Sequence, residues 1–191
     1  MENKNDNLNA QQSLELITNM IREAKGNMQK SSFYFLLWGW TIVIANLGVY
    51  IMLEFTTIGN PFIIFGITIP AAIISMIYGM NQGKKVIAPT ILNNINKWMW
   101  IGFGINCFIL VFFGGKTNWQ INPIIITMCA APTFLSGIML RFKPLIVGGI
   151  LFWVFGITSF MIDSKAQFLL AAVALTVGYL IPGYMLKKSE A

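Results

Sequence analysis

The chain has 191 residues, of which 56% are hydrophobic and only 10% are charged, and its mean hydropathy is +0.68. This composition excludes an ordinary water-soluble globular domain, in which apolar residues make up a smaller share. The net charge of +6 does not indicate nucleic-acid binding, because the basic residues are spread along the chain rather than gathered on one element. We therefore expect lipid to be the solvent of most of the chain.

The first thirty residues are polar and lack the apolar core and small-residue cleavage site of a signal peptide. Within them, apolar side chains recur at steps of three and four, as in an amphipathic helix over residues 10–30. These side chains are Leu14, Ile17, Ile21, Ala24 and Met28. Two interpretations stay open. The stripe packs on the protein's own loops or lies in the lipid headgroup layer, or it docks, mainly through Leu14, Ile17, Ile21 and Met28, on a partner or a second copy.

Six continuous apolar windows follow, each close to the roughly 20 residues that a membrane-spanning helix needs. They cover residues 32–55, 61–80, 98–115, 121–140, 145–162 and 167–186. The sequence therefore predicts an all-α polytopic membrane bundle with six transmembrane helices. Its divisions are a cytoplasmic segment with an amphipathic helix (1–31), the transmembrane domain (32–186) and a cytoplasmic tail (187–191).

The basic residues indicate how the bundle is oriented. With the N-terminus in the cytoplasm, only Lys116 and Lys165 of the thirteen basic residues fall outside. The others are Lys4, Arg22, Lys25, Lys30, Lys84, Lys85, Lys97, Arg141, Lys143, Lys187 and Lys188. Because cytoplasmic loops of membrane proteins carry an excess of Lys and Arg, we expect both termini to be cytoplasmic.

A repeated pattern, Trp-x-Trp-x5-Asn, occurs in the first and third windows. It runs from Trp38 to Asn46 and again from Trp98 to Asn106. Trp153 precedes Ser159 by the same spacing that separates the second tryptophan of each copy, Trp40 or Trp100, from its asparagine. The even-numbered windows also end on similar stretches before basic residues. We therefore predict three similar hairpins of one orientation, a parallel repeat. The preference of Trp for the membrane interface explains where these residues lie but not the spacing to Asn.

Polar side chains within the windows have two interpretations. An unpaired amide is costly in hydrocarbon, so we expect Asn46 and Asn106 each to find a partner across a helix interface. The alternative is that they line a polar path together with Thr133, Ser159 and Tyr179.

Small residues and prolines predict how the helices meet and where they bend. Cys107 and Cys129 are interpreted as small packing residues. Rows of small residues permit close helix approach, and they comprise Ala71, Ser75, Gly79 and Gly83 in one window and Cys129, Thr133 and Gly137 in another. Pro70, Pro132 and Pro182 should kink or locally unwind their helices.

The chain contains no histidine, and no charged residue falls in the middle of a predicted span. A Ser-His dyad and the usual zinc ligand sets therefore lack their components, and ion-coupled pumps usually keep an ionisable residue in the bundle. The sequence predicts no catalytic, cofactor-binding or metal-binding residue, and we expect a protein that is not an enzyme.

One stretch carries a resemblance. The residues from Met20 to Lys25 (MIREAK), followed by Ser32 to Trp40 (SFYFLLWGW), resemble a family of uncharacterised small bacterial inner-membrane proteins, mainly over residues 13–46. The resemblance implies a bacterial plasma membrane and six spans, and it implies no activity.

Two functions are compatible with these observations. The first is an accessory, scaffold or signal-relay subunit whose cytoplasmic N-terminal helix meets a cytoplasmic or membrane protein, or a second copy of the chain. The alternative is a small channel or permease for an uncharged or weakly polar solute, lined by Asn46, Asn106, Thr133, Ser159 and Tyr179. In either case the bilayer is the main partner.

Overall fold

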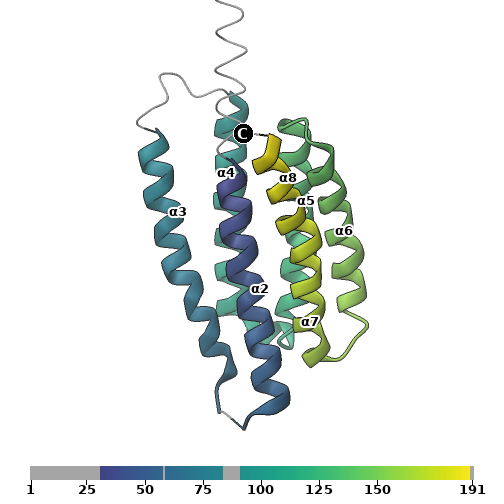
Figure 1. Cartoon of the computed structure of the whole chain (residues 1–191). Helices are drawn as coiled ribbons and strands as arrows, with labels where there is room; N and C mark the ends of the chain where they lie inside the picture. Colours follow the sequence, from purple (N-terminus) through teal and green to yellow (C-terminus); the bar gives the residue numbers. More distant parts are fainter. Residues whose placement is uncertain (1–30, 58, 84–90, 190–191) are drawn as a thin grey trace, which may run out of the picture.

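The structure is a computed structural model that describes residues 31–57, 59–83 and 91–189. Every regular element in these ranges is helical, and the long helices run alternately up and down, side by side (Figure 1). In chain order the elements are α2 (Ser32–Phe55), η2 (Pro61–Ile67), α3 (Thr68–Gly83), α4 (Ile91–Phe112), η3 (Gly114–Thr117), α5 (Ile121–Met139), α6 (Lys143–Ser159), α7 (Ser164–Leu175), η4 (Thr176–Leu180) and α8 (Ile181–Ser189). The predicted amphipathic helix at 10–30 lies outside the described residues.

The predicted apolar windows all coincide with helices. Five helical segments are long and apolar enough to cross a membrane, and α6 is a shorter apolar helix of 17 residues. The bounds of α2 agree with the predicted window. The start of α4 does not, because the helix begins at Ile91 rather than at residue 98. Asn93, Asn94 and Lys97 lower the hydropathy of this first stretch without interrupting the helix, so a hydropathy window begins too late.

Four helical segments form the packed core: α2, α5, α6 and the continuous run α7–η4–α8. The most extensive packing joins α5 to α6 and α2 to α7, which belong to different predicted hairpins. Glycines set the α5–α6 distance. A methyl group on Gly149 would lie 2.6 Å from the backbone nitrogen of Phe134, and one on Gly137 would lie 2.6 Å from that of Ile146. The two backbones therefore touch, as small residues allow.

The helices α3 and α4 lie at the edge of this core. Ala71 is the only buried residue of α3, and α4 has none. The small-residue face of α3 lies toward α2: the Ser75 hydroxyl accepts a hydrogen bond of 3.0 Å from Trp38 Nε1, and Gly79 lies against the Tyr34 hydroxyl. In α4 one side contacts α5, and the rest of the helix faces outward.

Two of the three prolines coincide with a change of helix type. Pro70 lies just after the tight 3₁₀ helix η2 passes into α3, and Pro182 just after the wide π-helical turn η4 passes into α8. Proline has no N–H to donate to the carbonyl four residues earlier, which disturbs the α-helical pattern there. Pro132 lies inside an uninterrupted α5. The helix type therefore changes near two of the three prolines, from a tighter form before Pro70 and from a wider form before Pro182.

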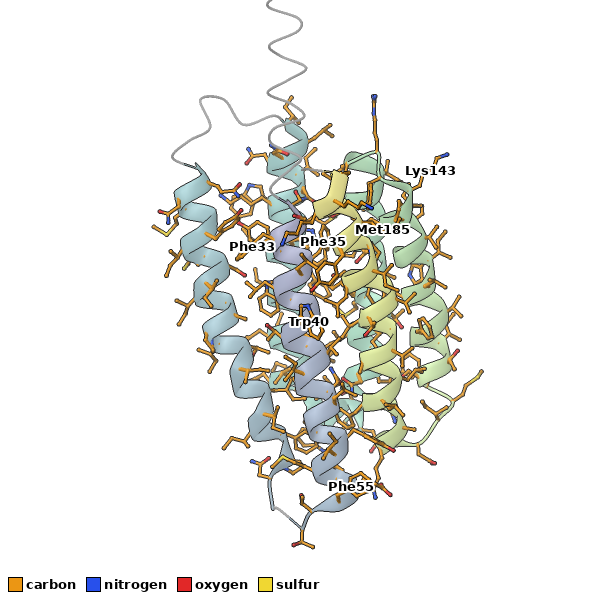
Figure 2. All side chains as sticks on the ribbon, in the orientation of Figure 1. Phe33, Phe35, Trp40, Phe55, Lys143 and Met185 are labelled. Carbon is orange, nitrogen blue, oxygen red and sulfur yellow. The ribbon has the colours of Figure 1, made fainter. Side chains whose placement is uncertain are left out.

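The described charges separate between the two ends of the bundle. Figure 2 shows Lys143 at the same end as Phe33 and Phe35, with Phe55 at the other end. We call the first of these the basic end, because five described basic residues lie at or near it: Lys97, Arg141, Lys143, Lys187 and Lys188. At the opposite end Lys165 Nζ forms an exposed ion pair of 3.3 Å with Glu54.

Candidate functional site

The most concentrated buried polar group in the described structure surrounds Tyr179. The π-helical turn η4 places Tyr179 against α5, where Cys129 and Thr133 follow each other by one helical turn. The three side chains are almost completely buried, with exposed fractions of 4% for Tyr179, 5% for Cys129 and 0% for Thr133. We call these three residues the Tyr179 cluster.

Hydrogen bonds connect the members of the Tyr179 cluster. The Tyr179 hydroxyl lies 2.8 Å from Cys129 Sγ, and either group can donate. The Thr133 hydroxyl donates over 2.7 Å to the Cys129 carbonyl oxygen, and it also lies 3.3 Å from the Tyr179 hydroxyl. Because a hydroxyl has a single proton, the Thr133 hydroxyl donates it to the nearer acceptor, the Cys129 carbonyl oxygen. The cluster is thus nearly satisfied by its own members.

Aromatic side chains enclose the Tyr179 ring on several sides. Its centroid lies 5.1 Å from that of Phe152, 5.5 Å from that of Phe35 and 6.2 Å from that of Trp100. The first two rings are roughly perpendicular to Tyr179, an arrangement that aromatic pairs favour. These neighbours come from α6, α2 and α4, so Tyr179 is the point where the packed core and the peripheral helix α4 meet.

A second series of hydrogen-bonded polar side chains lies one to two turns further along α5. Trp100 Nε1 donates to Ser136 Oγ over 3.1 Å, and Ser136 Oγ donates to Asn96 Oδ1 over 2.7 Å. This series holds α4 on α5 in the way that interhelical hydrogen bonds do in membranes. Asn96 was not predicted to have a role. Ser136 belongs to the stretch by which the end of the fourth predicted window resembles the ends of the second and the sixth, but no hydrogen bond was predicted for it.

The chemistry of these residues is that of helix contacts. Neither hydrogen-bonded series contains a charged group, and each hydroxyl or thiol is bonded to a neutral partner. Within the described residues, no group of three or more His, Cys, Asp and Glu side chains comes together in a way that could hold a metal ion.

The five predicted path-lining residues do not share one location. Thr133 and Tyr179 are in contact, as described above, whereas Asn106 is exposed on α4. Ser159 is fully buried on α6, and its hydroxyl has no hydrogen-bond partner among the described residues. The interpretation as a common polar path is therefore supported only for the pair Thr133 and Tyr179.

Asn46 and Asn106 were predicted to form hydrogen bonds to neighbouring helices. The hydrogen bonds that they form in the structure stay within their own helices, so this prediction is wrong. Each amide nitrogen donates to the carbonyl four residues earlier in its own helix, to Ile42 over 2.8 Å and to Gly102 over 3.0 Å. Such local bonds compete with interhelical ones for short polar side chains. Asn46 is 1% exposed, and its Oδ1 has no partner among the described residues.

Asn106 belongs to an outward face of α4. Residues at helical spacing form this outer face, and they are Trp98, Gly102, Ile105, Asn106 and Ile109. Trp98 is 64% exposed and Ile105 is 56% exposed. A methyl group added to Gly102 would meet no atom within 4 Å. The outer face of α4 thus combines a half-buried glycine that has open space beside it, an exposed polar amide and exposed bulky apolar side chains.

The four candidate docking residues of the N-terminal segment, Leu14, Ile17, Ile21 and Met28, lie outside the described residues. Their docking role stays a prediction.

Comparison of the chain with protein-family models, with curated proteins and with solved structures found no match.

Proposed function

We propose that the protein is a multi-pass protein of a bacterial plasma membrane, with both termini in the cytoplasm, that acts without catalysis as an accessory, scaffold or signal-relay subunit. Its contacts would be made by the cytoplasmic N-terminal helix and, within the bilayer, by the outer face of α4. In this proposal the six helices form three similar hairpins.

Membrane insertion is supported by the length and apolarity of the helices and by the apolar side chains on the bundle surface. Orientation is supported by the charge separation, because basic residues concentrate on the cytoplasmic side of membrane proteins. The hairpin repeat is supported by a tryptophan-to-serine hydrogen bond within each of the first two proposed hairpins, Trp38 to Ser75 and Trp100 to Ser136, although the two donors are not equivalent positions of the repeat. The matching serines precede the basic ends of the second and fourth spans.

The orientation has a direct test with two single-cysteine additions. Thr117→Cys lies in η3 and Ser189→Cys ends α8, at opposite ends of the bundle. A membrane-impermeant maleimide should label Thr117→Cys in intact spheroplasts and Ser189→Cys only after the membrane is opened. The unsubstituted chain is the control for the native cysteines. Equal labelling of both variants from outside would contradict the proposed topology.

One observation carries the contact function: Asn106 is an exposed amide in the second half of a helix that would cross the membrane. Among the described residues its side chain bonds only within α4, so its carbonyl oxygen would face hydrocarbon in an isolated chain. Exposing a polar group to hydrocarbon is unfavourable, and the open Gly102 beside it allows another helix to approach closely. A transmembrane helix that brings a hydrogen-bond donor to Asn106 would satisfy both features.

This function is tested by replacing Asn106 with Leu, which has a similar volume. An interhelical hydrogen bond in lipid contributes roughly 0.6 to 2 kcal/mol, so the complexed fraction of the protein should fall about fivefold in mild detergent. Blue-native electrophoresis and co-purification measure that fraction. Thr158→Val is the matched control, because Thr158 is another exposed side chain bonded to its own helix, at Val154.

Two results would contradict the contact function. One is a wild-type protein that runs only as a monomer without associated chains. The other is an equal effect of Asn106→Leu and Thr158→Val on the complex, since that would remove the special role of the outer face of α4.

A further inference from the structure

A groove with a volume of about 480 Å³ lies along α2 at the basic end of the bundle. This volume is within the range of roughly 300 to 1,000 Å³ that ligand pockets occupy. One face of α2 forms the floor, and η2 and α8 each add one residue. The lining residues are Ser32, Phe33, Leu36, Leu37, Trp40, Thr41, Ile44, Ile67 and Lys187. Figure 2 marks two of them, Phe33 and Trp40, along α2 between α3 and α8.

The groove has the length of a lipid chain in one leaflet. It begins at Ser32 and ends at Ile44, a distance along the helix of about 18 Å. Half the hydrocarbon thickness of a bilayer is about 15 Å. The groove therefore extends from the surface of one leaflet to about the middle of the membrane.

Its walls are apolar and stay open at the side. Trp40 is 46% exposed and Ile44 is 53% exposed, so the groove is accessible from the surrounding lipid. Trp40 Nε1 donates to the Tyr184 hydroxyl over 3.0 Å, which fixes the indole against α8. Gly183 of the same helix approaches Leu36 closely.

A positive charge stands at the mouth of the groove. Lys187 is exposed at the basic end, and Lys188 is its neighbour. The only ion pair among the described residues joins Lys165 to Glu54 at the opposite end. Lys187 thus has no acidic partner in the part of the chain that the structure describes.

We infer that the groove binds one anionic phospholipid of the cytoplasmic leaflet. One acyl chain lies along α2 from Leu36 to Ile44, and the headgroup phosphate contacts Lys187. The apolar floor, the lateral opening and the charge at the headgroup level together match this class of ligand, since basic residues at the membrane surface attract anionic lipids. The inference rests on the proposed membrane location and does not depend on a protein partner.

Native mass spectrometry of the full-length protein in detergent tests the site, with phosphatidylglycerol and phosphatidylethanolamine of identical acyl chains as probes. Wild type should retain one phosphatidylglycerol in preference to phosphatidylethanolamine. Lys187→Gln should weaken phosphatidylglycerol binding about fivefold, the effect of one basic residue at the surface. Lys143→Gln is the matched control, because Lys143 is exposed at the same end but does not line the groove.

A second variant tests the apolar part of the site. Thr41→Phe places a ring in the groove and should lower the retention of both lipids. Elution volume and melting temperature close to those of wild type verify that this variant is folded. Equal retention of the two lipids, together with no effect of Lys187→Gln or Thr41→Phe, would overturn the inference.

The occupant in the cell is identified with a photoreactive benzophenone side chain at Leu37. A phospholipid adduct supports the inference. An adduct with residues 1–31 of the same chain, or with a second copy, would overturn it by showing that protein fills the groove. Failure of the membrane proposal is distinguishable, because a chain outside the membrane would be extracted by alkaline carbonate.

Discussion

The contact between α5 and α6 gives the sharpest stability prediction, which concerns Gly149→Ala. The new methyl group would lie 2.6 Å from Phe134 N and 2.7 Å from Phe134 Cα. These are backbone atoms of a helix, so they cannot move aside as the end of a flexible side chain could. Overpacking of this kind costs roughly 1 to 3 kcal/mol against a gain in helix propensity of about 1 kcal/mol, so we expect a net loss of up to about 2 kcal/mol.

Gly102→Ala is the matched substitution at a position with open space, since a methyl group there meets nothing within 4 Å. Only the propensity gain applies, so we expect unchanged or higher stability, by up to about 1 kcal/mol. The assay is reversible unfolding of both purified variants in mixed micelles by SDS titration. A Gly149→Ala protein as stable as Gly102→Ala would refute the close packing of α5 on α6.

Three further substitutions have distinct expected results in the same unfolding assay. Tyr179→Phe keeps the ring contacts and removes the hydroxyl bonded to Cys129, so the free energy of unfolding should fall by roughly 0.6 to 2 kcal/mol; no change would mean that this bond is energetically neutral. Ser159→Ala removes a fully buried hydroxyl without a partner among the described residues and should leave stability unchanged or raise it by about 1 kcal/mol; a clear loss would reveal a partner. Lys165→Gln breaks the ion pair with Glu54. Because the two side chains are 57% and 44% exposed, the free energy of unfolding should fall by at most about 1 kcal/mol. A larger fall would disagree with the exposed position of the pair.

The helices could be predicted from the sequence because a spanning helix is a local feature. Length and continuous apolarity identify α2 from residue 32 to residue 55 without any knowledge of its neighbours. The start of α4 was predicted at residue 98 instead of Ile91. Hydropathy indicates which residues suit lipid, whereas a helix can continue through polar residues outside the lipid. A change of helix type lies next to Pro70 and Pro182 but not next to Pro132. Because all three prolines lack the N–H, the presence of proline alone does not predict where the helix type changes.

The pairing of helices could not be predicted in this way. Cys129 and Tyr179 are fifty positions apart, and nothing in either window indicates that the π-helical turn η4 brings them together. The spacing Trp-x-Trp-x5-Asn predicts equivalent positions in two hairpins, but the bonding differs between the copies. Trp38 bonds to α3 through Ser75, whereas in the second copy it is Trp100, not Trp98, that bonds to a serine.

The two asparagines show why a polar residue in an apolar window does not define its own partner. Both donate to their own helix, yet Asn46 is buried in the core and Asn106 is exposed. The sequence places them at equivalent positions in the repeat. Only the position of each helix in the bundle, core for α2 and edge for α4, separates a packing residue from a candidate contact residue.

Photocrosslinking in cells tests the contact function most directly. Benzophenone side chains at Ile17, Ile21 and Ile105 probe the N-terminal helix and the outer face of α4, and Ile150, which is 46% exposed on α6, is the control. We expect one dominant protein adduct from position 105, another from position 17 or 21, and only lipid adducts from position 150. Adducts limited to lipid and to the chain's own residues at all four positions would contradict it.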